Sequence, residues 1–285
     1  MLKITVRMDS RSNEEIAKEK KNESLIRIAN ENRKIINDGY YFVNGKRVDL
    51  VDCIQWSKRN KKSIMPQEIV IDKAKTVYKS TEIVFTNTTT IQTCKELHKA
   101  NTKFIALNFA NGFTPGGGYL YGADAQEESL CRCSALYETL INDKMYDVNR
   151  EQILHDSTSW MIFSPKVPVF RDENHELLDE PYLVDFISSA APDKHISGVD
   201  SEQMLDKRID RLFEVCISLD YTTLLLGAWG CGAFGNDEKL IAQSFYKYIE
   251  GKYSSRFERI IFAIYANNEH DKNLTSFINT FKSLT

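Results

Sequence analysis

From about residue 82 onward, short runs of β-branched and aromatic residues alternate with segments whose apolar residues recur every three or four positions. The first pattern is typical of buried strands and the second of amphipathic helices. A chain in which strands and helices alternate folds into a sheet that helices cover on both faces. Residues 81–285 are therefore predicted to form a three-layer α/β/α domain with a mixed central sheet.

The individual elements of this domain can be read from the sequence. Strands are predicted at residues 82–87, 104–110, 160–165, 183–191, 222–230 and 259–266, and helices at 89–100, 128–141, 204–219 and 238–250. Residues 166–181 join two strands and contain two prolines and a cluster of charges, so we expect a surface hairpin or loop there. Within it, the charged residues of 172–176 are interpreted as a solvated turn and not as a metal site.

An extension precedes the domain. Residues 12–37 are strongly charged, with apolar residues at helical spacing, which predicts a helix. Asn44-Gly45 lies between aromatic and β-branched residues, a strong signal for a β-hairpin. We therefore divide the chain into a helical and hairpin extension, residues 1–80, and a core, residues 81–285.

Charge and hydropathy limit the partners of the chain. The 37 basic and 40 acidic residues give a formal charge of -3, so no broad field attracts a polyanion, and any phosphate must be recognised locally. The first residues lack the apolar core of a secretory signal, and no stretch reaches the roughly 20 apolar residues that span a bilayer. We expect a cytoplasmic monomer with no membrane partner.

Metal sites and disulfides are not predicted. The six cysteines include no C-x-x-C pair, and Cys131 and Cys133 point to different sides of a predicted helix. Asp and Glu residues are dispersed without a cluster suited to magnesium. We therefore expect no metal and no cofactor, and activity that persists in a chelator.

The most informative segment runs from a strand through a glycine-rich loop into a helix, residues 108–130. Gly116, Gly117 and Gly118 permit positive φ angles and close approach of the backbone to a ligand. The helix then starts with Gln126, Glu127 and Glu128. Acidic residues at a helix start are also common as caps, so this motif alone leaves capping and catalysis equally open.

A second glycine-rich loop follows the predicted strand at 222–230. It contains Gly230, Gly232 and Gly235 and leads directly into a helix. Free backbone N–H groups beside a helix N-terminus form an anion-binding nest suited to a diphosphate, and we expect Gly232 to need a positive φ there. Trp229 fits a core position and Phe234 a loop position, whereas Cys231 has no neighbouring histidine that would make it a nucleophile.

These motifs resemble those of the microbial-type poly(ADP-ribose) glycohydrolases, which belong to the macrodomain superfamily. The Gly116–Gly118 run followed by Gln126-Glu127-Glu128 resembles the signature of that family. Asn108 and Asn111, just before the glycines, resemble the ribose-side motif of macrodomains. GAWGCGAFGND, residues 227–237, resembles their diphosphate-binding loop.

The resemblance implies a macrodomain that hydrolyses the ribosyl O-glycosidic bond of poly(ADP-ribose) by carboxylate acid/base catalysis and releases ADP-ribose. It implies that Glu128 is the catalytic acid/base and that Glu127 holds a ribose hydroxyl. It also implies that Asn111 and the first glycine loop position the distal ribose, against which Phe234 packs. The implied substrate-binding residues are Asn108, Asn111, Gly116, Gly117, Gly118, Gln126, Gly230, Cys231, Gly232, Ala233, Phe234, Gly235 and Asn236.

Two other functions stay open at this point. One is a non-catalytic ADP-ribose reader, which needs the glycine loops but has no use for paired glutamates. The other is a hydrolase that removes single ADP-ribose units from proteins, nucleic acids or small derivatives. The expected partners are thus poly(ADP-ribose) or ADP-ribosylated macromolecules.

Overall fold

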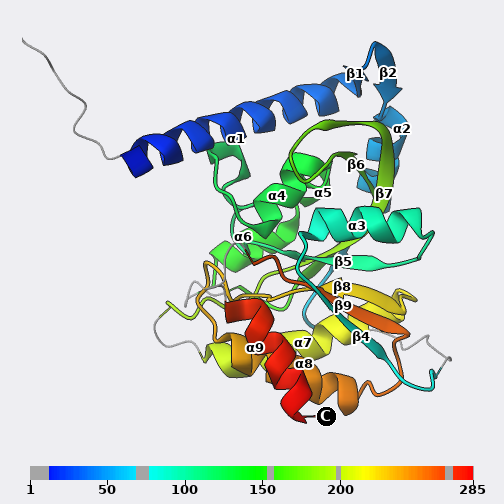
Figure 1. Cartoon of the computed structure of the whole chain (residues 1–285), viewed down its shortest axis with the longest axis vertical. Helices are drawn as coiled ribbons and strands as arrows, with labels where there is room; N and C mark the ends of the chain where they lie inside the picture. The colour runs from blue at the N-terminus through cyan, green and yellow to red at the C-terminus, as the bar shows by residue number, and fades with distance from the viewer. Residues whose placement is uncertain (1–12, 69–76, 153–156, 197–199, 267–271, 285) are drawn as a thin grey trace, which may run out of the picture.

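The computed structural model describes residues 13–68, 77–152, 157–196, 200–266 and 272–284. Its centre is a seven-stranded sheet in the order β3-β6-β7-β5-β8-β9-β4 (Figure 1). The strands are β3 (Lys62–Ile64), β4 (Glu82–Thr86), β5 (Ile105–Phe109), β6 (Met161–Arg171), β7 (Leu177–Ser189), β8 (Thr223–Leu226) and β9 (Arg259–Ala263). From β7 through β5, β8 and β9 to β4 each strand is parallel to the next, whereas β6 pairs antiparallel with both β3 and β7. The mixed sheet confirms the predicted fold class.

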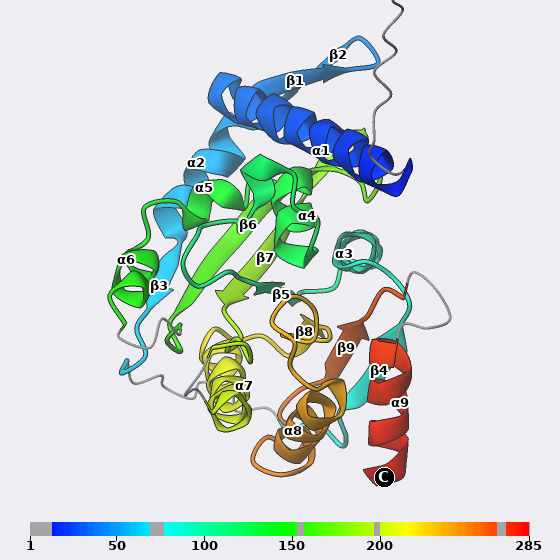
Figure 2. The same ribbon diagram turned by 90° about the vertical axis from the view of Figure 1, so that its left-hand side faces the viewer.

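Helices cover both faces of the sheet (Figure 2). One face carries α7 (Ser201–Ser218), α8 (Glu238–Glu250) and α9 (Lys272–Leu284). The other carries α3 (Thr90–Lys99), α4 (Gln126–Cys133), α5 (Tyr137–Leu140) and α6 (Lys144–Arg150), together with the N-terminal helices. Because successive side chains of a strand point to opposite faces of the sheet, the core is divided into two hydrophobic clusters. In β5, Ala106 belongs to one cluster, and Ile105 and Leu107 belong to the other.

The N-terminal segment forms α1 (Asn13–Asp38), the hairpin β1 (Tyr40–Val43) and β2 (Lys46–Asp49), and α2 (Val51–Asn60). The predicted hairpin turn is confirmed, because Asn44 and Gly45 both have positive φ, 49° and 75°. The following strand, β3, pairs with β6 at the edge of the central sheet. The division of the chain at residue 80 stays a prediction.

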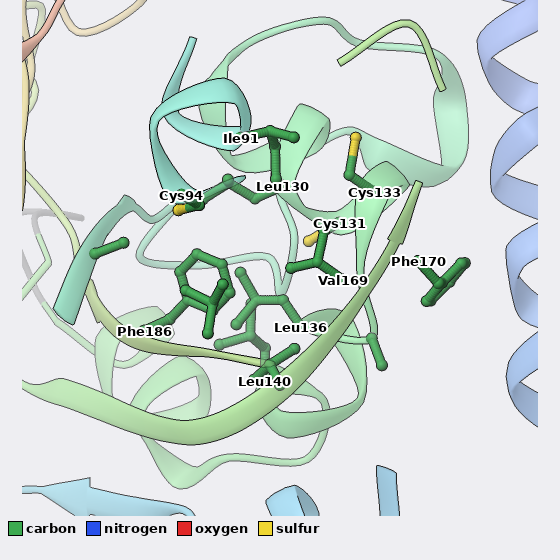
Figure 3. Close-up of a cluster of buried hydrophobic side chains, with 14 of the residues drawn as sticks. Ile91, Cys94, Leu130, Cys131, Cys133, Leu136, Leu140, Val169, Phe170 and Phe186 are labelled. Carbon is green, nitrogen blue, oxygen red and sulfur yellow. The ribbon is translucent and has the colours of Figure 1, made fainter. Parts of the chain in front are cut away.

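The hairpin predicted as one alternative for residues 166–181 is confirmed, but the expectation that this segment lies on the surface was wrong in part. β6 and β7 continue through the segment as a long antiparallel hairpin, with a turn only at 172–176. Val167, Val169 and Phe170 are fully buried, and Figure 3 shows Val169 and Phe170 within a hydrophobic cluster. The N-terminal segment covers this end of the hairpin, where the Tyr41 and Phe170 ring centroids lie 6.0 Å apart.

The single helix predicted at 128–141 is in fact two helices, α4 and α5, that are separated at Ser134. Ser134 is extended, with φ -147° and ψ 177°, and forms a β-bridge with Val169 of β6. Its hydroxyl donates to the Leu130 carbonyl at 2.7 Å, which ends α4. The break places Cys131 and Cys133 among buried apolar side chains (Figure 3), and all six cysteines are free thiols.

Candidate active site

A cleft of about 640 Å³ lies where the parallel strands β4, β5, β8 and β9 end. In sheets of this kind, the loops after the carboxyl ends of the strands form the ligand site. Two loops predicted to bind the same ligand, separated by about a hundred residues in sequence, meet across this cleft. The tertiary fold therefore brings the two motifs together.

The predicted site residues divide into two groups. Those that line the cleft are Asn111, Gln126, Glu127, Glu128, Gly230, Gly232, Ala233 and Phe234. Those that lie outside its lining are Asn108, Gly116, Gly117, Gly118, Cys231, Gly235 and Asn236. Several residues of the second group contact residues of the first: Asn108, Gly117 and Gly118 contact the two glutamates, and Asn236 contacts Gly230.

Glu127 is a buried carboxyl group in the first turn of α4, with only 3% of its surface exposed. It accepts hydrogen bonds from Asn108 Nδ2 at 3.1 Å and from the Asn111 backbone N–H at 2.7 Å. Burial raises the pKa of Glu127 to about 8, because desolvation outweighs these hydrogen bonds, and the neighbouring Glu128 raises it further. Near neutral pH this carboxyl group holds its proton.

Glu128 faces the same cleft and also caps the helix. Its Oε1 accepts from the Gly118 N–H at 2.9 Å, and its Oε2 accepts from the N–H of the N-cap residue Ala125 at 3.2 Å. The second bond is one half of a capping box, whose other half an alanine cannot supply. Capping and a position in the cleft are thus properties of one side chain, and they do not exclude each other.

The first glycine run makes room for these two carboxyl groups. Gly116 and Gly117 have positive φ, 68° and 57°, as expected. A Cβ on Gly117 would overlap Glu128 Oε1 and would lie 3.2 Å from Glu127 Oε2. The close backbone approach that we expected toward a ligand is therefore an approach to the start of α4.

Asn111 and Gln126 use their amides differently. Asn111 Oδ1 accepts from the N–H groups of Phe113 and Thr114, at 2.8 and 2.9 Å, and Nδ2 has no partner among the described residues. Gln126 donates to the Leu107 carbonyl at 2.8 Å and accepts from the Phe109 N–H at 2.9 Å. Asn111 therefore offers a donor to the cleft, whereas Gln126 ties α4 to the end of β5.

The second glycine loop exposes backbone donors. The N–H groups of Gly232, Ala233 and Phe234 form no hydrogen bond with any residue that the structure describes, and all three residues line the cleft. Such a row of N–H groups binds anions. Positive φ occurs at Gly230 and Gly235, 82° and 65°, but not at Gly232, so the expectation for Gly232 was wrong.

Contacts behind the second loop hold it in place. Asn236 Nδ2 donates to the Pro192 and Gly230 carbonyls, at 2.8 and 3.1 Å. Trp229 is fully buried, and its Nε1 donates to the Ser189 carbonyl at 3.2 Å, whereas Phe234 is only partly buried. Asp237 caps α8 directly after the loop. The loop is a preformed structure.

The structure argues against chemistry by cysteine at this site. Cys231 lies outside the cleft lining, and burial raises the pKa of its thiol, which disfavours the nucleophilic thiolate.

Among the described residues, no group of three or more histidine, cysteine, aspartate or glutamate side chains could hold a metal ion. None of the described helices has both the length and the apolar character needed to cross a bilayer.

Several cleft residues were not predicted. Residues 88–91 and 263–265 line it from the ends of β4 and β9, and they could have been found because both segments follow strands of the parallel part of the sheet. Lys21 of α1, Asp124, and Glu173 and His175 of the β6–β7 turn line it as well. No sequence signal indicates that these distant segments meet.

The raised pKa of Glu127 predicts a specific pH dependence of stability. The unfolded carboxyl group titrates near 4.5 and the folded one near 8, so between these values only the folded state keeps the proton. Its contribution is fully present below pH 4.5 and is lost as the pH rises to 8, by roughly 4 kcal/mol. In melting curves from pH 5 to 9, Glu127→Gln should lose less stability with rising pH than the wild type. If the stabilities of the two proteins change in parallel with pH, Glu127 does not hold a buried proton.

Comparison with known proteins agrees with the geometry. The family model "Microbial-type PARG, catalytic domain", where PARG denotes poly(ADP-ribose) glycohydrolase, matches residues 29–172. The solved PARG of Thermomonospora curvata is 31% identical, with a TM-score of 0.84, over 91% of this chain and 100% of that one. Its complex with the inhibitor ADP-HPD is 32% identical, with a TM-score of 0.81, over 90% and 99%.

A second bacterial structure gives a similar result. The Deinococcus radiodurans PARG in complex with ADP-ribose is 31% identical, with a TM-score of 0.73, over 81% of this chain and 97% of that one. A search of curated proteins finds no match. The motifs, the cleft and these likenesses agree, and the chain belongs to the microbial-type poly(ADP-ribose) glycohydrolase family.

Proposed function

We propose that this chain hydrolyses the ribosyl O-glycosidic bond between ADP-ribose units and releases ADP-ribose. The observation that carries the proposal is the pair of buried carboxyl groups, Glu127 and Glu128, in one cleft with the unpaired N–H groups of residues 232–234. A diphosphate fits the second feature and acid/base chemistry the first. The T. curvata structure bound to ADP-HPD and the D. radiodurans structure bound to ADP-ribose support the assignment.

The reaction requires a proton for the departing oxygen, a base that activates water, and stabilisation of positive charge on the ribose. Glu128 performs the first two steps in turn, as acid and then as base. Glu127 accepts from a ribose hydroxyl, and Asn111 Nδ2 donates to the same sugar. With the diphosphate bound to residues 232–234, the ribose is fixed by the diphosphate on one side and by Glu127 and Asn111 on the other.

Glu127 lies beside Glu128 and can supply the proton that the first step needs. Burial raises the pKa of Glu127 to about 8. Both groups lie against Gly117, since a Cβ there would overlap one and lie 3.2 Å from the other.

We further propose that the enzyme removes the terminal unit of a polymer. Lys21 of α1 lines the cleft together with Glu173 and His175 of the β6–β7 turn, so the N-terminal segment borders the groove. Early in digestion of labelled poly(ADP-ribose), free ADP-ribose should appear while long polymer persists. Early accumulation of mid-length oligomers would contradict this. Turnover of singly modified protein without turnover of polymer would assign the site to mono-ADP-ribosyl substrates, and binding without turnover would make the protein a reader.

Gly232→Val should weaken ADP-ribose binding without unfolding the protein. No protein atom lies within 4 Å of a Cβ at this position and its φ is not positive, so valine fits the fold. Its side chain would enter the space in front of the N–H groups and weaken binding by about 10-fold or more, with a smaller effect for Gly232→Ala. Calorimetry with ADP-ribose, with melting curves as the folding control, measures this. Unchanged affinity in a folded Gly232→Val would place the diphosphate elsewhere.

A further inference from the structure

A buried arginine, Arg132, forms hydrogen bonds with the segment that leads into α4. Arg132 is 0% exposed and lies on the same helix as the two glutamates. Its Nη1 donates to the Ala123 carbonyl at 2.7 Å, and its Nη2 binds Asp124 Oδ1 at 2.7 Å. From the outside, Lys21 Nζ of α1 binds the other oxygen of Asp124 at 2.8 Å. The segment 122–125 is thus held from both sides.

This segment supplies one of the two hydrogen bonds that Glu128 accepts and is bonded to the residue that supplies the other. The Ala125 N–H donates to Glu128 Oε2. The Ala123 N–H donates to the Gly118 carbonyl at 3.2 Å, and the Gly118 N–H in turn donates to Glu128 Oε1. A shift of residues 122–125 would therefore move the Ala125 donor directly and disturb the Gly118 donor through its bond with Ala123. Two hydrogen bonds connect the guanidinium of Arg132 to Glu128 Oε2 through this segment, and three connect it to Oε1.

The N-terminal helix takes part in the same arrangement. Asn32 Nδ2 of α1 donates to the Arg132 carbonyl. A Cβ on Gly122 would lie 2.7 Å from the Asn22 carbonyl of α1, so the backbone of the two segments is in direct contact. α1 is therefore part of the frame around the glutamates.

A gain in folding stability is a weak explanation for the buried Arg132 and its ion pair with Asp124. A buried ion pair is often replaced by apolar residues of similar volume without loss of stability. Arg132 Nε also has no hydrogen-bond partner among the described residues. The side-chain hydrogen bonds that Arg132 does form both go to the segment before α4, and the one to Asp124 is also an ion pair.

We propose that Arg132 is a positioning residue, which acts with Asp124 and Lys21 to hold the backbone donors that orient Glu128. The inference rests on the proposed role of Glu128 as acid/base. A carboxyl group displaced by about 1 Å from its reactive geometry loses on the order of 10²-fold in rate. No hydrogen bond joins residues 232–234 to this segment, so we expect the diphosphate site to keep its structure when the segment shifts.

The test compares Arg132→Lys and Arg132→Met with Arg171→Lys. Arg171 is also buried, at 4% exposure, and bonds Asn32 and Glu31 of α1 and the His175 carbonyl, but forms no hydrogen bond with residues 122–125. It therefore controls for loss of a buried arginine that holds α1 without holding this segment. We expect kcat to fall by about 10-fold for Arg132→Lys, which can keep one of the two contacts, and by about 10²-fold for Arg132→Met. KM and ADP-ribose affinity should stay at the wild-type values. Arg171→Lys should lower the melting temperature but keep kcat.

Asp124→Asn keeps the test decisive if the Arg132 variants do not fold. This variant leaves the guanidinium and the Ala123 contact in place and should lower kcat several-fold, by a larger factor than any change in KM. A wild-type kcat in folded Arg132→Lys or in Asp124→Asn would overturn the inference, as would an equal loss of kcat in Arg171→Lys. Glu128→Gln in the same assay separates the two proposals. If it is inactive while the Arg132 variants keep full kcat, only the positioning role fails; if it is active, the acid/base assignment fails.

Discussion

Glu128→Gln should reduce hydrolysis of poly(ADP-ribose) by about 10²–10⁴-fold, because the variant loses the group that donates and accepts the proton. Glutamine keeps the length of the side chain, and its carbonyl oxygen still accepts one of the two backbone N–H groups at the start of α4. No hydrogen bond joins this side chain to the second glycine loop, so ADP-ribose should still bind. Initial rates with labelled polymer and calorimetry with ADP-ribose measure the two properties separately.

The matched control for this variant is Glu138→Gln. Glu138 is a half-buried glutamate of α5 that pairs with Lys58 at 2.6 Å and lies outside the cleft lining. It should keep the wild-type rate. If Glu128→Gln retains a rate close to that of Glu138→Gln, another group performs the proton transfers.

Gly117→Ala should lower kcat by about 10²-fold, the second large effect that the structure predicts. The added methyl group would overlap Glu128 Oε1 and would lie 3.2 Å from Glu127 Oε2, so both carboxyl groups must move. The backbone there also has φ 57°, which alanine adopts only with a strain of about 1 kcal/mol. Steady-state kinetics and melting curves report the two consequences separately.

Gly45→Ala isolates the backbone strain from the clash. Gly45 has φ 75° in the β1–β2 turn, and a Cβ there meets no protein atom within 4 Å. This control should lose about 1 kcal/mol of folding free energy and keep full activity. If Gly117→Ala behaves like Gly45→Ala, the glycine is needed for the turn alone and the carboxyl groups tolerate displacement.

The sequence predicted the core fold well where packing on a sheet determines the pattern. All six strands predicted from residue 82 onward are present, because buried parallel strands require short runs of β-branched and aromatic residues. It missed α2, β3 and α6, which span ten residues or fewer, and it overlooked α9, whose apolar residues do recur at helical spacing. It also missed the break at Ser134, since the apolar period continues through α5, whereas the backbone there pairs with Val169 of a distant strand.

The two glycine-rich loops and the paired glutamates are readable in the sequence because their chemistry depends on residue type: glycine for positive φ and carboxyl groups for proton transfer. Only the tertiary structure decided how they are used. It turned the first glycine run toward Glu127 and Glu128, since removal of side chains permits any close approach and does not select the partner. It raised the pKa of Glu127, because burial depends on neighbours far along the chain. It also brought Lys21 and Arg132 to Asp124, because the packing of α1 against α4 has no local signature in the residues that meet there.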